Sequence, residues 1–354
     1  MCIVDIGRPI KPGKPGDLPE ILMFSFTQTN FEEWDRRRNF MKNYLLFYLK
    51  YIIYLACIFL SAITDCSEKK GTYTQSYNVN DNLRIVSLAP SITETLFALN
   101  LGKNIIGVTN FCNYPEQAKK IEKIGTFTDP SFEKIILLRP NLVVLTKEND
   151  KAKQFLSEHS IKYLEVESNT ISQICHSFLT IGRYCRREKE AQKLVDVFDD
   201  ISHKKPAVSN TPKILICVGR DGPGSGAIRN VFIAGKSTFY NDLVNLAGGR
   251  NCYKNDMPVY PNLSREGILS IKPDIIIDIS PAMRSITCGS LKGDWDDLSI
   301  LPAVKNSEVY CIAKDYATIP GPRITLLLED IKEIVRKHEE KYTSKEGIPL
   351  STGS

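Results

Sequence analysis

Histidine is scarce in this chain, and its cysteines are poorly placed for binding a metal. Only four His occur in 354 residues, at positions 159, 176, 203 and 338, and no two have the spacing of metal ligands. The ten Cys include no Cys-x-x-Cys pair. A site for a bare transition-metal ion needs several imidazole or thiolate ligands, so the sequence predicts no metal site. Most of the cysteines are expected to be small buried apolar residues, although disulfides stay possible in an exported chain.

Motifs for catalysis and for nucleotide binding are also missing. No Gly-x-Ser-x-Gly elbow is present, and no His has suitable neighbours beside a strand end. Gly222, Gly224 and Gly226 are spaced GxGxG instead of GxGxxG. The segment AGKS at 234–237 resembles the end of a P-loop, but Asn230 stands where its first glycine is required. The sequence therefore predicts no catalytic residues and no cofactor.

The charge pattern points to no nucleic-acid partner. The formal net charge is +5 in 354 residues, and the basic residues are spread along the chain. Nucleic-acid-binding domains concentrate positive charge on one face or in one stretch. We therefore expect no nucleic acid among the partners.

One long apolar run stands out near the N-terminus. Residues 44–60, YLLFYLKYIIYLACIFL, follow a short basic start at Met41 and precede small and polar residues that end at Cys66. This order is typical of a bacterial lipoprotein signal peptide. We predict a signal peptide over 41–66, lipidation of Cys66, and an exported, membrane-anchored protein.

Two alternatives stay open for this segment. Cys57 is a second candidate for lipidation, since Asp65 replaces the small residue that usually precedes the lipidated cysteine. The run is also nearly long enough to remain as a transmembrane anchor, although Lys50 in its middle counts against this. Residues 1–40 resemble no structured segment and are interpreted as a mis-called extension. Residues 67–82 are polar and are interpreted as a tether.

After the tether, strand-like runs alternate with helical patterns, which predicts an α/β lobe over 83–185 with a parallel sheet. Ser91 fits a helix N-cap, and Glu94 completes a capping box three residues later. The remaining elements follow from apolar spacing and from prolines that end helices. The expected strands are 84–88, 105–108, 142–145 and 162–166, and the expected helices are 92–99, 132–138 and 150–159.

From position 171 to about 204 the chain is helical, with one interruption near 185–187. We predict a linking helix over 186–205. A second α/β lobe over 206–345 follows, with strands at 213–218, 231–233 and 275–279 and a last helix at 324–342. The predicted fold class is α/β, with two Rossmann-like lobes that contain parallel sheets and are joined by one long backbone helix.

The two predicted lobes repeat one local pattern. An aromatic on a loop precedes a serine that starts a helix, an acidic residue follows, and the helix ends at a basic residue and a proline. Phe127, Ser131 and Glu133 hold these places in the first half; Tyr260, Ser264 and Glu266 hold them in the second. Phe111 lies on a further loop after a strand. Aromatics on such loops suit a cleft for a bulky ligand.

The chain from about 83 to 342 resembles the helical-hinge class of bacterial solute-binding proteins of ABC importers, which take vitamin B12, iron–siderophores or haem. The matching segments lie in both lobes: RIVSLAPSITETLFALNLG, GVTNFCNYPEQA, FEKIILLRPNLVV, NVFIAGKSTFYNDLVNLAGGRN, YPNLSREGILSIKPDIII and PGPRI. Together they are specific for the class and much less so for the ligand. The resemblance implies a ligand held between two lobes that close little.

The resemblance is strongest to the vitamin B12-binding members, and it assigns roles to individual residues. It implies ligand contacts at Phe111, Phe127, Tyr260 and Asp315. Glu133 and Glu266 fall where the class carries one acidic residue per lobe, each pairing with an arginine pocket on the permease. Two of the aromatic positions are Tyr or Trp in the vitamin B12 binders' pattern and are phenylalanine here, which keeps apolar contact and removes a polar group.

The resemblance thus implies a lipid-anchored binding protein that captures a corrinoid, cobalamin, and delivers it to an ABC permease. A ferric siderophore or haem is the alternative within the class. Cationic side chains in the cleft would favour an anionic siderophore, and Arg220, Arg229 and Arg265 are nearby in sequence. Outside the class, a two-domain α/β enzyme and a sensor ectodomain remain as alternatives.

Overall fold

The computed structural model describes residues 83–202, 211–280 and 287–346. The chain divides into two units, 1–77 and 78–354, and all described residues belong to the second. The predicted extension 1–40, signal peptide 41–66 and tether 67–82 lie outside the described residues, and Cys57 and Cys66 lie there with them. Within the described ranges, none of the helices combines the length and apolar character needed to cross a bilayer.

The first lobe contains the predicted parallel sheet, which has four strands in the order β2-β1-β3-β4. Its strands are β1 (Ile85–Ser87), β2 (Ile105–Val108), β3 (Leu142–Thr146) and β4 (Tyr163–Val166). Its helices are α2 (Pro90–Ala98), α3 (Phe132–Leu138) and α4 (Asp150–Glu158), with short 3-10 turns η1 (Gly102–Asn104) and η2 (Glu116–Lys120).

Helices cover both faces of this sheet because its strands are apolar on both faces. Successive strand side chains point to opposite sides. Leu142 and Val144 therefore pack with α2, whereas Val143 and Leu145 pack with α3 and α4. This burial of both faces is typical of parallel sheets.

Helix α2 begins two residues earlier than predicted, at Pro90 instead of Ile92, and the predicted capping box is absent. The N-cap is Ala89, whose side chain cannot accept a hydrogen bond, and Pro90 is the first residue of the helix. Proline suits this position since its fixed φ is helical and its missing N–H is not needed there. Glu94 is buried and bonds to Arg323 in the second lobe instead of to the helix start.

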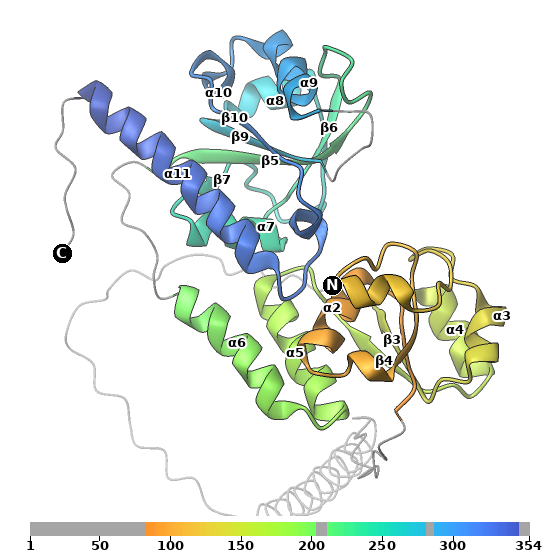
Figure 1. Cartoon of the computed structure of the whole chain (residues 1–354). Helices are drawn as coiled ribbons and strands as arrows, with labels where there is room; N and C mark the ends of the chain where they lie inside the picture. Colours follow the sequence, from red (N-terminus) through yellow and green to blue (C-terminus); the bar gives the residue numbers. More distant parts are fainter. Residues whose placement is uncertain (1–82, 203–210, 281–286, 347–354) are drawn as a thin grey trace, which may run out of the picture. The chain divides into compact units, whose positions relative to one another are not determined.

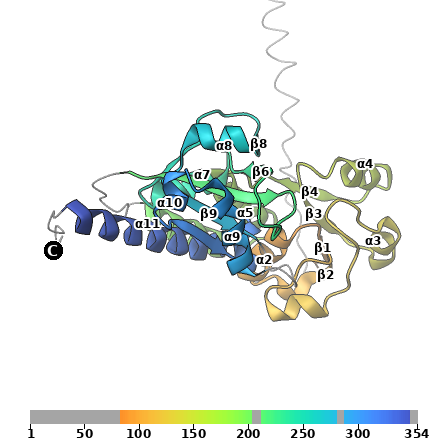
Figure 2. The ribbon, with the colours of Figure 1, turned by 90° about the horizontal axis from the view of Figure 1, so that it is seen from above.

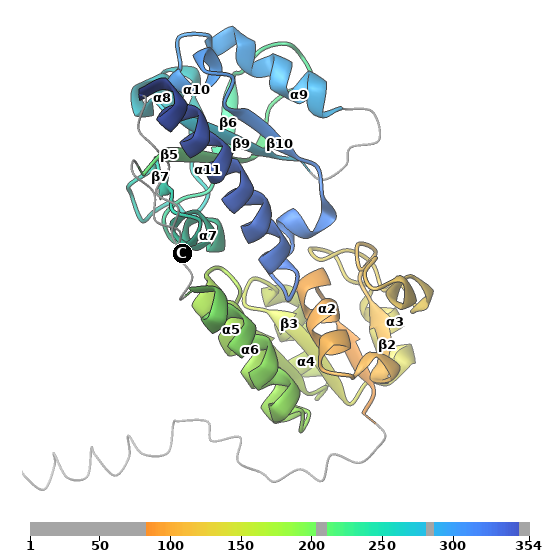
Figure 3. The ribbon, with the colours of Figure 1, turned by 60° about the vertical axis from the view of Figure 1, so that its left-hand side comes forward.

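Two helices, α5 (Ile171–Tyr184) and α6 (Glu188–Ser202), follow the first lobe and lie side by side (Figures 1 and 3). The predicted interruption at 185–187 is confirmed. The two helices approach closely at Gly182, where a Cβ would come within 2.5 Å of the Ala191 Cβ. The sequence predicts α6 as the link, and α5 shares its role.

Both helices contribute to the cores of both lobes. Ile181 of α5 and Ala191 of α6 pack in the core of the first lobe. One or two turns away, Phe178 of α5 and Phe198 of α6 pack in the core of the second. A pair of packed helices resists bending more than a strand or loop would, which agrees with the small closure expected for this class.

The second lobe contains a six-stranded sheet with strand order β10-β9-β5-β6-β8, and β7 pairs with β5. The predicted parallel pairing holds for β5, β7, β9 and β10, whereas β6 pairs antiparallel with both β5 and β8. The short glycine-rich connection from β5 to β6 can form a hairpin but not a crossover. The strands are β5 (Lys213–Arg220), β6 (Asn230–Ile233), β7 (Arg250–Asn251), β8 (Asn262–Ser264), β9 (Ile275–Ile279) and β10 (Val309–Ile312).

The helices of this lobe cover opposite faces of the sheet (Figures 1 and 2). Ile214 and Ile216 face α7 and α11, whereas Leu215 and Cys217 face α8 and η3. The elements are α7 (Phe239–Leu246), α8 (Arg265–Ile271), α9 (Cys288–Asp294), η3 (Trp295–Leu298), α10 (Pro302–Lys305), η4 (Asp315–Thr318) and α11 (Ile324–Glu346).

The glycine-rich loop after β5 is held by a buried ion cluster. Arg220 bonds to Asp278 and, at 2.9 Å, to Asp294. The backbone N–H groups of Gly224 and Gly226 donate to the Asp294 carboxylate at 2.6 and 2.5 Å. Both glycines have positive φ, which aims their N–H groups at this carboxylate. The N–H groups of the loop thus bind Asp294 of α9 and not a phosphate. This explains why the spacing of its glycines departs from nucleotide-binding motifs.

A disulfide joins Cys288, at the start of α9, to Cys311 in β10. Such a bond fits an oxidising compartment outside the cytoplasm. Five further cysteines in the described residues are free, and four of them are buried. They agree with the expectation of small apolar core residues.

The C-terminal half of α11 is fastened to the start of β10 through Glu308. This buried carboxylate lies 3.8 Å from His338 and 3.1 Å from the Lys341 ammonium, and it accepts a 2.8 Å hydrogen bond from the Tyr310 hydroxyl. Burial alone would raise the pKa of Glu308, but the bonds to these partners lower it to about 2. Glu308 is therefore ionised in the folded protein at neutral pH.

Candidate functional site

A pocket of about 220 Å³ lies between the lobes, at the carboxyl ends of the first lobe's strands. Ser91 follows β1, Thr146 ends β3, and Asn169 follows β4. The second lobe adds Thr318 to Pro320, which connect η4 to α11. Ligands of open parallel α/β sheets bind outside the carboxyl ends of strands, so this is the expected position for a binding cleft.

Phe127 lines this pocket, as the sequence suggested. It is half-buried against the core of the first lobe. Its carbonyl oxygen accepts a 2.9 Å hydrogen bond from the Asn149 side chain, which fixes the loop. The backbone of Phe127 is thus fixed, and the side chain is partly packed in the core while it also lines the pocket.

Tyr260, in the second lobe, is not among the residues that line this pocket, but it lies close enough to the lining residue Glu148 for that charge to affect it. Partial burial and the negative charge of Glu148, a pocket residue of the first lobe, raise the pKa of Tyr260 to about 12. Its hydroxyl therefore stays protonated at neutral pH and can donate a hydrogen bond. Tyr260 is 40% exposed.

Phe111 and Asp315 lie outside the lining of this pocket. Phe111 follows β2 and is 64% exposed, which leaves most of its ring without protein contacts. Asp315 begins the 3-10 helix η4, whose last residue, Thr318, lines the pocket. Asp315 bonds to Arg323 through both carboxylate oxygens, at 3.1 and 3.0 Å, and these bonds lower the pKa of Asp315.

Sequence reasoning missed the ion pair between Glu94 and Arg323, which joins the two lobes without lining the pocket. The sequence places Arg323 in the segment PGPRI and predicts a capping role for Glu94. Ser91 and Pro320 line the pocket close to this pair. A sequence signal did exist, because a carboxylate amid the apolar residues of a buried helix needs a cationic partner elsewhere.

The two candidate docking helices are alike in detail. In α3, the Ser131 hydroxyl accepts from the Lys134 N–H, and in α8, the Ser264 hydroxyl accepts from the Gly267 N–H. Both helices have seven residues, carry an acidic residue in the first turn, and end in a residue with φ of 46° before a proline. Glu133 and Glu266 are both exposed. The repeated pattern read from sequence is thus a repeated local structure.

The three arginines that the sequence offered as candidate cleft cations do not line the pocket. Arg220 is buried with its two aspartates, and Arg265 bonds to Asp297. Arg229 is exposed, near the start of β6. Among the pocket's lining residues, Glu148 alone carries a charge.

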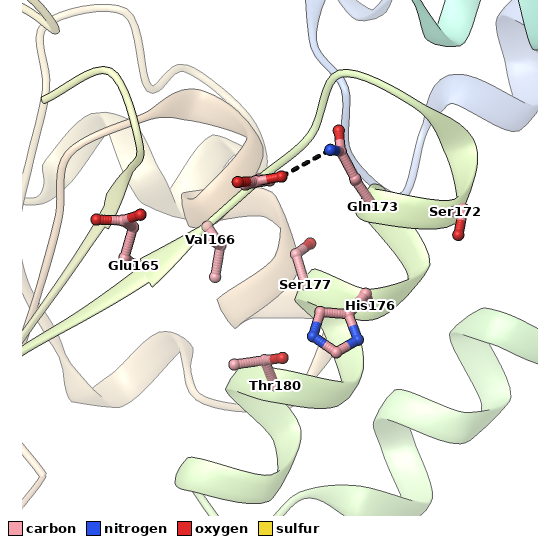
Figure 4. Close-up of a pocket in the computed structure, with 8 residues that line it drawn as sticks. Glu165, Val166, Ser172, Gln173, His176, Ser177 and Thr180 are labelled. Atoms are coloured by element: carbon pink, nitrogen blue, oxygen red, sulfur yellow. Dashed lines mark hydrogen bonds between the residues drawn. The ribbon is translucent and has the colours of Figure 1, made fainter. Parts of the chain in front are cut away.

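A second, larger hollow lies on the first lobe between β4 and α5 (Figure 4). Its volume is about 450 Å³, and its lining includes Glu165, Glu167 and His176. Both carboxylates are already paired, with Lys153 at 3.1 Å and with Lys147 at 2.8 Å. The hollow receives no residue from the second lobe, so it is not the inter-lobe cleft. Across the residues that the structure describes, no three His, Cys, Asp or Glu side chains gather as a metal site would require.

Comparison with known proteins defines the class. The model of the periplasmic binding protein family matches residues 85–316. An uncharacterized ABC transporter substrate-binding lipoprotein of Bacillus subtilis, YvrC, is 30% identical over 264 residues, covering 71% of this chain and 79% of the relative. The vitamin B12-binding protein of Pectobacterium atrosepticum is 26% identical, covering 70% and 86%.

Solved structures agree on the fold. A possible iron-binding periplasmic solute-binding protein of Staphylococcus epidermidis has a TM-score of 0.60 at 26% identity, covering 71% of this chain and 98% of that one. The haem-binding protein HutB of Vibrio cholerae has a TM-score of 0.61 at 21% identity, covering 72% and 99%.

The chain belongs to the periplasmic binding protein family. It is the substrate-binding protein of an ABC importer, in the class that includes vitamin B12-, siderophore- and haem-binding proteins. The family also implies export to the periplasm or the cell surface. Members of this family bind without catalysing a reaction, so the predictions of class, fold and absence of enzymatic activity are confirmed.

Proposed function

We propose that this protein captures a corrinoid, cobalamin, in the cleft between its lobes. The observation that carries the proposal is the chemistry of the pocket lining. Apolar Phe127 and Ile319 alternate with the hydroxyl and amide groups of Ser91 and Asn169, and Glu148 is the single charged residue. A corrin offers apolar faces and a rim of neutral amides, which match such a lining.

The charge of Glu148 supports a corrinoid over the anionic alternatives. Haem carries propionates, and siderophores of ferric iron are commonly anionic, so a lone carboxylate in the pocket opposes both. No arginine lines the pocket to balance it. Relatives named vitamin B12-binding protein support the same ligand.

An iron complex is the second candidate. It is supported by the solved structure described as possibly iron-binding, at 26% identity. We also propose that no cofactor resides in the protein.

The ligand is larger than the pocket in the ligand-free protein. Pockets for drug-sized ligands usually have about 300–1,000 Å³, against about 220 Å³ here. We propose that the corrin sits over the pocket mouth with Phe127 and Phe111 on one side and Tyr260 on the other. Asp315 stands at the edge.

Delivery is proposed to use Glu133 and Glu266. One exposed carboxylate stands on each lobe, in matching first turns of α3 and α8. The packed helices α5 and α6 fix the separation of the lobes, so the two carboxylates form a bivalent dock for cationic pockets on the permease. We also propose lipidation at Cys66, in keeping with the lipoprotein name of the Bacillus subtilis relative.

Calorimetric titration tests the ligand. The fragment from residue 67 onward is titrated separately with cyanocobalamin, haemin and a ferric siderophore. The proposal predicts tight, one-to-one binding of cyanocobalamin. Binding of haemin or of the siderophore without cobalamin would replace the ligand and keep the class.

A further inference from the structure

Arg323 lies at the contact between the lobes and bonds to both. Its guanidinium donates to both oxygens of Glu94, at 2.9 and 2.6 Å, and to both oxygens of Asp315, at 3.1 and 3.0 Å. Glu94 belongs to α2 of the first lobe, whereas Asp315 and Arg323 belong to the second. A planar guanidinium with five N–H donors is suited to holding two carboxylates at once.

The first lobe surrounds this arginine. The guanidinium carbon of Arg323 lies over the Tyr114 ring, 3.8 Å from the ring centroid. The backbone beside it is also close, since a Cβ on Gly321 would lie 3.4 Å from the Cα and carbonyl oxygen of Ser91. The arginine therefore occupies a cage built by α2 and the loop that carries Tyr114.

The two carboxylates differ in exposure. The Glu94 side chain is 2% exposed and that of Asp315 is 63% exposed. Burial raises the pKa of Glu94, against the opposing effect of Arg323, so its charge depends on this partner. The bonds from Arg323 lower the pKa of Asp315 and keep it ionised. Removing the arginine would leave one buried and one exposed carboxylate facing each other.

We propose that Arg323 is a positioning residue for ligand capture. It fixes the separation of the lobes through Glu94 and Tyr114, and it holds the Asp315 carboxylate in one place at the cleft. The effect on ligand affinity rests on the proposed function. The effect on the separation of the lobes does not. The helices α5 and α6 join the lobes on one side, and the Arg323 contact joins them a second time, through residues 229 positions apart in sequence.

The consequence is a preorganised cleft. Lobes held at two places sample few separations, so binding costs less ordering free energy than it would between freely moving lobes. Without Arg323, the protein spends most of its time more open before it binds ligand, and its apparent affinity is the intrinsic affinity multiplied by the fraction of molecules that are closed.

The test compares Arg323→Gln, Glu94→Gln and the double variant, with Arg336→Gln as the matched control. Arg336 bonds only to Glu333 and Glu340 within α11, so its loss removes ion pairs without touching the cleft. Small-angle X-ray scattering of the ligand-free chain from residue 67 gives the radius of gyration. Calorimetry with cyanocobalamin gives Kd, and circular dichroism verifies folding.

Arg323→Gln should enlarge the radius of gyration and weaken Kd about tenfold, which corresponds to about 1.4 kcal/mol. Glu94→Gln should do the same, and the double variant should be no weaker than Arg323→Gln, because the two residues act as one unit. Arg323→Lys keeps the charge and loses the bidentate geometry, so it should recover part of both effects. An unchanged radius and Kd in Arg323→Gln would overturn the proposal, as would strictly additive effects in the double variant.

Failure of the proposed ligand is distinguishable from failure of this inference. If the unmodified protein binds haemin or a ferric siderophore instead of cobalamin, the same series is measured with that ligand. The scattering comparison needs no ligand. Equal radii for Arg323→Gln and Arg336→Gln would then refute the inference by themselves.

Discussion

Truncation of Phe111 separates ligand binding from stability better than any other change in the cleft. Fully burying a phenylalanine side chain is worth about 1.5–3 kcal/mol. Since Phe111 is 64% exposed, roughly two thirds of that, about 1–2 kcal/mol, is available to a ligand that covers it. Phe111→Ala should therefore weaken cyanocobalamin binding about 5- to 30-fold and leave the thermal midpoint nearly unchanged.

Two comparisons sharpen this prediction. Phe127 is already half-buried in the core of the first lobe, so Phe127→Ala should weaken binding less and lower the thermal midpoint more. Leu137→Ala serves as the control, because Leu137 is 79% exposed on α3 and does not line the pocket. Calorimetry and thermal unfolding of the three variants decide the matter. If Phe111→Ala binds as tightly as Leu137→Ala, Phe111 is not a ligand contact.

Three further predictions concern delivery, stability and export. Glu133→Arg with Glu266→Arg should leave ligand affinity unchanged and abolish uptake by cells, and normal uptake would refute the docking assignment. Since its bonding partners hold the pKa of Glu308 near 2, below the ordinary 4.5, this carboxylate stabilises the fold above about pH 4.5, and the contribution disappears as the pH falls towards 2. Glu308→Gln should thus lower the free energy of unfolding by about 1–3 kcal/mol at pH 7 and by much less at pH 2, in denaturant titrations; an equal loss at both pH values would contradict the linkage. Mass spectrometry of the mature N-terminus should find a lipidated Cys66, and an intact peptide spanning 30–60 would end the lipoprotein proposal.

Local sequence patterns predicted most of the fold because local physics determines those elements. The interruption at 185–187 and the matching starts of α3 and α8 follow from turn residues and serine caps, whose partners lie within four positions. The antiparallel pairing of β6 was missed, since apolar spacing reports that a segment is a strand and not which way its neighbour runs. The short strand β8 was not predicted as a strand.

The cleft was harder to predict because its key contacts join distant parts of the chain. Glu94 and Arg323 are 229 positions apart, and the local capping pattern offered a competing interpretation of Glu94. The disulfide between Cys288 and Cys311 was likewise left open, because spacing alone does not determine pairing. The internal repeat did relate Phe127 in the first lobe to Tyr260 in the second. A repeat compares distant segments of the chain, which the pattern of one helix or strand cannot do.

The visible absorption spectrum of the protein tests the central claim most directly. The exported protein is purified from cells grown with cobalamin, and its spectrum is recorded after gel filtration. The account predicts corrinoid bands that co-elute with the protein at about one ligand per chain, and the loss of these bands in the double variant Phe111→Ala, Tyr260→Ala. A haem or ferric-siderophore spectrum, or a colourless protein after incubation with excess cobalamin, would contradict it.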